Sequence, residues 1–433
     1  MTRGIYLADN GFDWAFNALK SGMKKGLVDI PSYSRFGFHI DPFSDELPFQ
    51  FPQAMFKFPS LLNAFELVGK HLSDQKNMLV IAPEQSGKTF FLKFLSNLLK
   101  KPESRLNTLY IDSVREWRYS DLKNENESTL KKFHQWLAPI VDLEAPDVLL
   151  VDNISSLLPN DIIFSIFHEL EVFDPQPIII ATLSFSEFQY ITSSPYLNSS
   201  SFLSAFSSHH CQFLPILSKN QMYDFFLSRL QITDAREDLF SSAALDKLIY
   251  LSSGLPGLAC KLASRCLDTA VEKDQLNEIT LEHVLLTLSK PIFLGLETCA
   301  SLVHGIYQIK QKNNIDTPDA NFARTTINTP RFAILQEALK FAGQSRLLLN
   351  SKKRSEFALL HGGVSNSFLQ NSPLGISKST ISHHLGTLSD QQNFLRIFER
   401  GRKKFYYLPE NNVGPLEAAS LLWSQSVEQE VRV

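Results

Sequence analysis

The sequence contains little cysteine and lacks any long apolar run. Its 433 residues include four cysteines, which show neither the paired spacing of a zinc site nor the framework of a disulfide-rich secreted domain. The amino terminus lacks the apolar core of a signal peptide, and no uncharged run reaches membrane-spanning length. We therefore expect a protein of a reducing compartment, the cytoplasm or the nucleus, without structural zinc.

A net charge of one sign is also missing. The chain carries 42 basic and 45 acidic residues, a net charge of -3. Any contact with nucleic acid must therefore come from a local basic patch rather than from the protein as a whole. The length exceeds that of one ordinary core, so we expect two or three domains.

One segment predicts a phosphate-binding loop. Residues 82–89 read Ala-Pro-Glu-Gln-Ser-Gly-Lys-Thr, between the apolar run 78–81 and the helical pattern 90–95. A strand, a tight turn of backbone N–H groups, a lysine and a hydroxyl are what phosphates and Mg²⁺ require. The first glycine of the pattern is replaced by Ala82, which tolerates fewer backbone angles. The residues expected at the nucleotide are Ala82, Pro83, Glu84, Gln85, Ser86, Gly87, Lys88, Thr89 and Phe90.

Three more apolar runs, 109–112, 147–152 and 177–182, have the lengths of buried parallel strands separated by helical segments. This alternation predicts a wound α/β domain. Asp152 ends the middle run, at the carboxyl edge of the sheet, where it would face the loop. We expect Lys88 to bind phosphate, and Thr89 and Asp152 to hold Mg²⁺.

The positions around Asp152 bear on hydrolysis. Asn153 follows it, and an amide can hold a water but cannot accept its proton. We expect slow hydrolysis, unless another base such as Glu169 or Glu171 takes part. Thr182, with Ser184 as second choice, lies where a polar side chain could sense the terminal phosphate, although such a hydroxyl could equally satisfy local backbone. The candidate catalytic residues are Lys88, Asp152, Asn153 and Thr182.

Helical patterns at 218–230, 242–251, 254–273 and 280–288 follow the strands. Strands succeeded by such a lid, with the signature Gly254-Leu255-Pro256, resemble the AAA+ superfamily over residues 59–290. Many relatives place an arginine after that proline, where this chain has Gly257, and no arginine finger is found before residue 213. We expect Arg229 to be a solvated lid residue. The segment 36–43 resembles the entry to the adenine site of several AAA+ families, but a stretch that pins the amino-terminal extension to the core would look the same.

The carboxyl-terminal part predicts a DNA-binding module. Pro330 opens a helix; later, Ser377 is a candidate N-cap for a helix that buries Ile381, Leu385 and Leu388. Two alternating strands around a basic glycine turn follow at 394–409. This order resembles the winged-helix family over 330–409, a family whose members bind duplex DNA or dock proteins; five basic residues in and beside the turn favour DNA. The expected DNA contacts are Lys378, Ser379, Thr380, Ser382, His383, Arg400, Arg402, Lys403 and Lys404.

The predicted fold class is α/β: a P-loop AAA+ parallel sheet core, an all-α lid and a carboxyl-terminal winged helix. The expected divisions are an extension (1–58), the core (59–217), the lid (218–292), a linker helix and polar linker (293–329), the winged helix (330–410) and a tail (411–433).

This order of domains most resembles the archaeal-type origin-recognition and replication-initiator ATPases. That resemblance implies ATP and Mg²⁺ as cofactors, duplex DNA as a ligand, protein partners or an oligomer formed through the AAA+ core, and nucleotide control of DNA or partner binding. A transposon-type target-selection or loader ATPase, an ATP-gated signalling or transcription regulator, and a nucleotide-stabilised scaffold are the alternatives.

Overall fold

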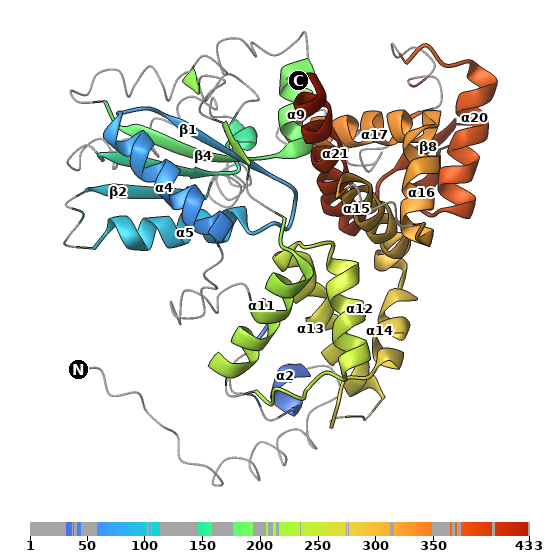
Figure 1. The fold of residues 1–433 in the computed structure, drawn as a ribbon, viewed down its shortest axis with the longest axis horizontal. Helices are drawn as coiled ribbons and strands as arrows, with labels where there is room; N and C mark the ends of the chain where they lie inside the picture. Colours follow the sequence, from blue (N-terminus) through green and yellow to red (C-terminus); the bar gives the residue numbers. More distant parts are fainter. Residues whose placement is uncertain are drawn as a thin grey trace.

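The computed structural model describes most of the chain in several separated ranges. These are residues 32–36, 38, 41–44, 59–101, 104, 106–112, 146–157, 176–193, 205–206, 211–213, 216–233, 235–273, 275, 277–311, 316–348, 364–365, 369, 374–400 and 403–431. A parallel sheet, a helical lid and a carboxyl-terminal module follow one another in the chain and lie side by side (Figure 1). The candidate residues Glu169, Glu171 and Arg402 lie outside these ranges.

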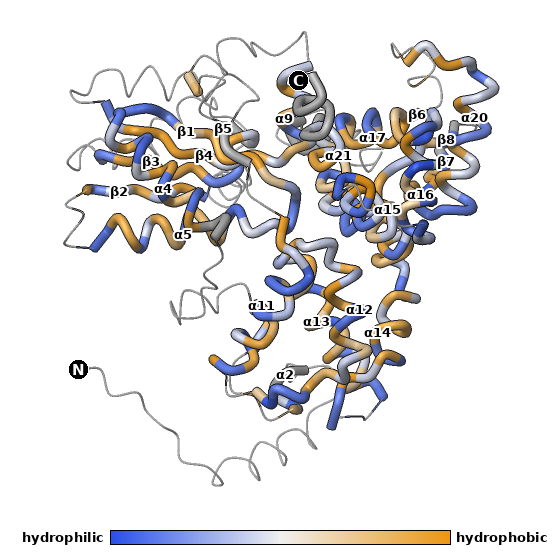
Figure 2. Tube along the Cα trace, viewed as in Figure 1, coloured by the Kyte–Doolittle hydropathy of each residue, from blue (hydrophilic) through white to orange (hydrophobic). Residues whose placement is uncertain are grey.

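The sheet has five parallel strands in the order β2-β3-β4-β1-β5. They are β1 (Met78–Ala82), β2 (Thr108–Asp112), β3 (Val148–Asp152), β4 (Ile178–Ser184) and β5 (Cys211–Phe213). Every residue of β1 and of β3 is buried, as expected of central strands covered on both faces, and Figure 2 shows these strands as hydrophobic. Helices α4 (Pro59–Ser73) and α5 (Lys88–Leu99) share an apolar cluster with the sheet. In it, Phe65 stacks on Phe91 at 4.9 Å between ring centroids.

The lid consists of α11 (Lys219–Ile232), α12 (Ser242–Ser252), α13 (Pro256–Glu272) and α14 (Leu281–Leu288). Two lid helices begin at serine N-caps, Ser218 and Ser241, each of which accepts a backbone N–H of the first turn. The short α2 (Ser32–Arg35) lies against α13.

The segment after α2 is pinned to the lid. The Phe43 ring meets Phe226 and Phe240 edge-on, at 5.9 and 5.7 Å. Arg229 is not solvated as predicted: it is 6 % exposed and donates to the carbonyls of Pro42 and Ser44 at 3.2 and 3.0 Å. Backbone carbonyls of the incoming segment need donors when they are buried, and Arg229 supplies them.

The polar linker expected within 293–329 is instead largely helical. After the short η4 (Pro291–Phe293), α15 (Leu296–Lys310) packs along α16 (Pro318–Ile327), which Thr317 caps. Gly305 allows this contact, because a Cβ there would lie 2.1 Å from the Asp319 carbonyl oxygen. Among the described residues, the stretch Pro291–Lys310 is long and apolar enough to cross a membrane by length and composition, but 44 % of it is buried inside the protein, as in core helices generally.

The carboxyl-terminal module combines α17 (Pro330–Leu348), α20 (Lys378–Gly386) and the π-helical turn η5 (Thr387–Gln391) with a small antiparallel sheet. That sheet has the order β6-β8-β7, from β6 (Val364–Ser365), β7 (Arg396–Arg400) and β8 (Lys403–Tyr407). The expected tail is in fact a helix, α21 (Glu410–Val431), whose first half is buried. The buried residues include the polar Asn411, Asn412 and Glu417. Polar residues at buried positions interrupt the apolar pattern, so the sequence did not predict a core helix.

Two hydrophobic cores can be traced among the described residues. One holds the sheet with α4 and α5. The other is continuous from the lid through α15 to the carboxyl-terminal module. Helix α17 also packs on α9 (Phe185–Ser193), which follows β4, and so joins the module to the sheet. The predicted architecture, a parallel α/β sheet followed by a helical lid, is confirmed by the strand order and the helices.

Candidate nucleotide-binding site

The predicted phosphate-binding loop connects β1 to α5 at the carboxyl edge of the sheet. Gln85 and Gly87 have left-handed backbone angles, with φ of 62° and 97°, which turn the loop sharply. The first N–H groups of a helix have no intrahelical acceptor, and Gly87 at the N-cap of α5 has no side chain to cap them. The Ser86 hydroxyl is buried without a hydrogen-bond partner. The loop therefore offers uncapped donors and an unsatisfied hydroxyl of the kind that phosphate oxygens accept.

The Lys88 side chain folds back onto the loop and hydrogen-bonds to it. Its side chain is 6 % exposed, and its Nζ donates to the carbonyls of Ala82 and Pro83 at 3.2 and 3.0 Å. These two acceptors are backbone oxygens, and the ammonium group also lies near the Asp152 carboxylate. Lys88 is thus placed to supply positive charge to a phosphate.

Asp152 lies beside the loop at the end of β3, as predicted. It is 1 % exposed, and burial raises its pKa, while hydrogen bonds from Thr182 and Thr89 and the nearby Lys88 charge lower it. Thr182 Oγ1 donates to Asp152 Oδ1 at 2.6 Å, and the Tyr110 hydroxyl lies 3.4 Å from Oδ2. Thr89 and Asp152 therefore meet as the prediction requires, and Tyr110 is a neighbour that the sequence analysis missed.

Thr182 satisfies local backbone, as one of its two predicted roles requires, while its predicted role as a phosphate sensor stays a prediction. Besides contacting Asp152, its Oγ1 accepts the backbone N–H of Asn153 at 2.9 Å. Asn153 has φ of 53°, a left-handed angle that asparagine tolerates. Thr182 therefore fixes both the carboxylate and the backbone turn that follows it.

Ser184, the second choice as a sensor, has another role. It caps α9: the Glu187 N–H donates to its Oγ at 3.3 Å, and Glu187 Oε2 accepts the Ser184 N–H at 3.0 Å and the hydroxyl at 2.6 Å. This Ser-x-x-Glu capping box is readable in the sequence and could have predicted the start of α9.

Two glycines bring other elements against the loop. The Gly257 N–H, at the start of α13, donates to the Gln85 carbonyl at 2.8 Å, and a Cβ on Gly257 would lie 2.8 Å from the same oxygen. A Cβ on Gly414, in α21, would lie 2.5 Å from the Glu84 carbonyl oxygen. Glycine at 257 thus allows the lid to touch the loop through its backbone.

Glu417 of α21 is another residue beside the loop that the sequence analysis missed. It is fully buried, and its Oε2 accepts the Glu84 N–H at 2.5 Å while its Oε1 accepts the Ser186 N–H at 2.9 Å. A single acidic residue among the apolar neighbours 416–422 was the available signal, since buried carboxylates need dedicated partners. The carboxylate joins the loop after β1 to the first turn of α9.

The donor set fits a magnesium nucleotide. Uncapped N–H groups, Ser86 and Lys88 suit phosphates, and Thr89 with Asp152 offers the hydroxyl and carboxylate oxygens that Mg²⁺ prefers. Within the described ranges, no group of three or more His, Cys, Asp or Glu side chains is placed to hold a metal ion by itself.

The expected DNA-contacting helix has its polar face outward. Ser377 caps α20 by accepting the Thr380 N–H at 3.2 Å, and Ile381, Leu385 and Leu388 are buried as predicted. The expected contacts that are exposed on this helix are Lys378, Ser379, Ser382 and His383, with Thr380 half-buried.

The hairpin forms as predicted, with β7 and β8 paired so that Arg400 faces Lys403 across its end. Lys404 is exposed and pairs with Glu399 at 3.3 Å, and the predicted contact Arg402 lies outside the described residues. Arg396 donates to the Pro291 carbonyl at 2.8 Å and so ties the hairpin to η4.

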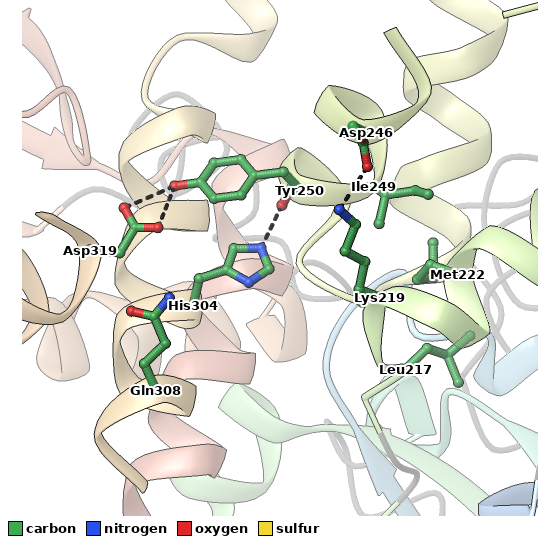
Figure 3. A pocket seen from close by; sticks show the side chains of 10 residues that line it. Leu217, Lys219, Met222, Asp246, Ile249, Tyr250, His304, Gln308 and Asp319 are labelled. Carbon is green, nitrogen blue, oxygen red and sulfur yellow. Dashed lines mark hydrogen bonds and ion pairs between the residues drawn. The ribbon is translucent and has the colours of Figure 1, made fainter. Parts of the chain in front are cut away.

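A cavity of about 320 Å³ lies between the lid and helices α15 and α16 (Figure 3). Tyr250 and His304 stack there at 4.5 Å, the Tyr250 hydroxyl donates to Asp319 at 3.1 and 3.2 Å, and His304 Nε2 donates to the Tyr250 carbonyl at 2.9 Å. Burial lowers the His304 pKa and raises that of Tyr250. These polar side chains bond to one another, so the network joins the lid to the linker helices.

The solved structures that align with this chain include a branch migration motor and a replication initiation protein. The Thermotoga maritima RuvB Holliday junction branch migration motor aligns at 16 % identity over 81 % of this chain and 92 % of that chain, with a TM-score of 0.40. Domain III of the T. maritima replication initiation protein DnaA aligns at 15 % over 57 % and 99 %, with 0.42. AMPPCP-bound DnaA from Aquifex aeolicus aligns at 12 % over 78 % and 90 %, with 0.39. At these identities and scores, the similarities carry no conclusion about function. No protein-family model and no curated protein matches the chain.

Proposed function

We propose that this chain binds a magnesium nucleoside triphosphate, ATP, at the loop 82–89 and uses the bound state to control duplex DNA or partner binding. The observation that carries the proposal is the meeting of Lys88, Thr89 and Asp152 at one edge of the sheet, beside uncapped loop N–H groups. A bland loop between a strand and a helix would need neither a buried lysine nor a buried carboxylate, because both are costly away from a charged ligand.

Each residue has a distinct part in this proposal. Lys88 and the N–H groups of the first turn of α5 hold phosphate charge, and Thr89 and Asp152 orient Mg²⁺, which when bound neutralises that charge. Thr182 holds Asp152 in place through its 2.6 Å hydrogen bond. Asn153 carries an amide where a base would be needed, so we expect slow hydrolysis and a switch rather than a motor.

Substitution of the loop lysine tests nucleotide binding. Lys88→Ala should weaken binding of a fluorescent ATP analogue about 10- to 100-fold, since a charge-assisted hydrogen bond contributes about 1.5–3 kcal/mol. Lys100→Ala, an exposed lysine just beyond the same helix, is the matched control and should leave affinity unchanged. Equal affinities for the two variants, or no binding by the wild-type protein, would refute the proposal.

The carboxyl-terminal module supports a proposed role in duplex DNA binding. Its elements follow in the order α17, β6, α20, β7 and β8, and this order supports the proposal of a winged helix in which α20 would be the recognition helix and the β7–β8 hairpin the wing. An exposed polar face on a capped helix beside a basic hairpin suits a groove and its phosphates. A DNA-associated protein of the cytoplasm or nucleus would follow from this role.

A salt series tests the DNA proposal. Joint replacement of Arg402 and Lys403 by alanine should weaken binding and reduce the salt slope by about two, since each lost phosphate contact releases about one counterion fewer. Lys76→Ala, an exposed lysine before β1, is the control. Binding that is insensitive to salt, or unchanged by the double substitution, would indicate that the module docks protein instead.

A further inference from the structure

Glu417 fills an anion site that the sheet creates at its carboxyl edge. Strands β1 and β4 are paired so that Ala82 lies opposite Ser184. Glu84 and Ser186 each lie two residues beyond these paired strand ends, and their N–H groups converge on one carboxylate, at 2.5 and 2.9 Å. Two backbone N–H groups directed at one anion form the kind of concavity that also binds phosphate.

The carboxylate is delivered by a helix that is fitted to this place. Gly414 lets α21 approach the Glu84 carbonyl, since any Cβ would lie 2.5 Å from it. Gln85 Nε2 lies 3.5 Å from Asn411 Oδ1. The apolar side of α21 belongs to the core shared with the lid and α15. Glu417 therefore reaches the two N–H groups when α21 is docked, and leaves them when α21 moves away.

We infer that Glu417 is a tethered competitor of the terminal phosphate, so that docking of α21 favours a nucleoside diphosphate over a triphosphate. The inference rests on the proposed nucleotide site. A third phosphate brings additional negative charge to the edge of the sheet where Glu417 already lies, and like charges at a buried site repel strongly. The coupling is reciprocal: if docking of α21 weakens triphosphate binding, triphosphate binding weakens the docking of α21 by the same free energy.

The test compares ATP and ADP affinities in matched variants. Glu417→Gln keeps the shape of the side chain but removes its charge. Glu410→Gln is the control, because Glu410 is an exposed acid on the same helix that pairs with Lys261 at the surface. With fluorescent analogues and Mg²⁺, we expect Glu417→Gln to tighten ATP binding by at least about fivefold and ADP binding by less than about twofold, within the usual range of coupling between sites. A purely structural role for Glu417 would not change the ratio of the two affinities.

A second pair of variants tests the same inference without altering Glu417. Gly414→Ala should push α21 off the loop and raise the preference for ATP, whereas Gly69→Ala in α4, where a Cβ would meet nothing within 4 Å, should not. Hydrogen exchange of the backbone at 410–421 should be faster with ATP than with ADP.

The outcomes separate this inference from the proposed function. If the wild-type protein binds neither nucleotide, the proposed function fails and this inference with it. If it binds nucleotide but Glu417→Gln and Gly414→Ala keep the ATP-to-ADP ratio of their controls, only the inference is overturned. Weaker ATP binding by both variants would also overturn it, because α21 would then support the triphosphate rather than compete with it.

Discussion

Replacement of Thr182 by valine tests how much the Thr182 hydroxyl stabilises Asp152, because the expected Mg²⁺ ligands Thr89 and Asp152 are left unchanged. Thr182 is fully buried on β4, and valine has nearly its shape but no hydroxyl. The change removes the 2.6 Å hydrogen bond to Asp152 Oδ1 and the acceptor of the Asn153 N–H at 2.9 Å. Both losses occur inside the protein, where water does not replace the missing partner.

The expected cost follows from these two bonds. A hydrogen bond to a charged group contributes about 1.5–3 kcal/mol, and removal of a buried acceptor adds about 1 kcal/mol or more, so we expect a total loss of about 2–4 kcal/mol. That is a large part of a typical stability of about 5–15 kcal/mol.

The cost should depend on pH with a definite sign. Burial already raises the Asp152 pKa above 3.8, and the Thr182 hydrogen bond is the largest influence that lowers it. A raised pKa means that the folded state holds the proton more tightly than the unfolded state, so stability falls as pH rises through the folded pKa. Without Thr182 the pKa rises further, and the destabilisation should be largest at neutral pH and shrink in acid.

Denaturant unfolding at about pH 4.5 and pH 7.5 would measure both effects. Thr192→Val is the matched control, because Thr192 is exposed and its hydroxyl donates to the Phe188 and Gln189 carbonyls of its own helix. This variant should lie within about 0.5 kcal/mol of wild type. The reasoning is refuted if Thr182→Val is as stable as this control at neutral pH, or if its loss is the same at both pH values.

Three further outcomes are expected. Asp152→Asn should be at least as stable as wild type in thermal unfolding at neutral pH, and this advantage should fade as pH falls through the Asp152 pKa. Its nucleotide affinity should no longer respond to Mg²⁺, which a titration with Mg²⁺ checks. Gly305→Ala should cost about 1–3 kcal/mol, because its Cβ would lie 2.1 Å from the Asp319 carbonyl, whereas Gly386→Ala meets nothing within 4 Å; urea unfolding compares them. Burial raises the Cys299 pKa well above its usual value, so a thiol reagent should modify Cys299 only as the protein unfolds, a rate that mass spectrometry can follow.

The elements that were predicted well share a local signal. The strand before the loop, the lysine and hydroxyl that follow, and Asp152 at the end of an apolar run are readable because buried parallel strands are continuous and apolar. The capped recognition-like helix was predicted for a similar reason, since Ser377 and the stripe of Ile381 and Leu385 are spaced within two turns.

What the sequence did not reveal depends on contacts between distant segments. The burial of Arg229 follows from carbonyls of residues 42 and 44, and the role of Glu417 follows from N–H groups of Glu84 and Ser186. In both cases the partners are distant in the chain, so no periodic sequence pattern predicts the contact. Helix α16 was taken for a linker because its exposed polar face dominates its composition, and only packing on α15 reveals its apolar side.

The aromatic contact between Phe43 and the lid also has a consequence for the order in which the protein can assemble. During synthesis, Phe43 leaves the ribosome before any part of the sheet, yet its partners Phe226 and Phe240 are made only after the last strand. Domains generally fold from the amino terminus as they emerge, and contacts between distant residues form late. The sheet should therefore be complete while the segment before it is still unattached, and arrival of the lid is the event that fastens the beginning of the chain.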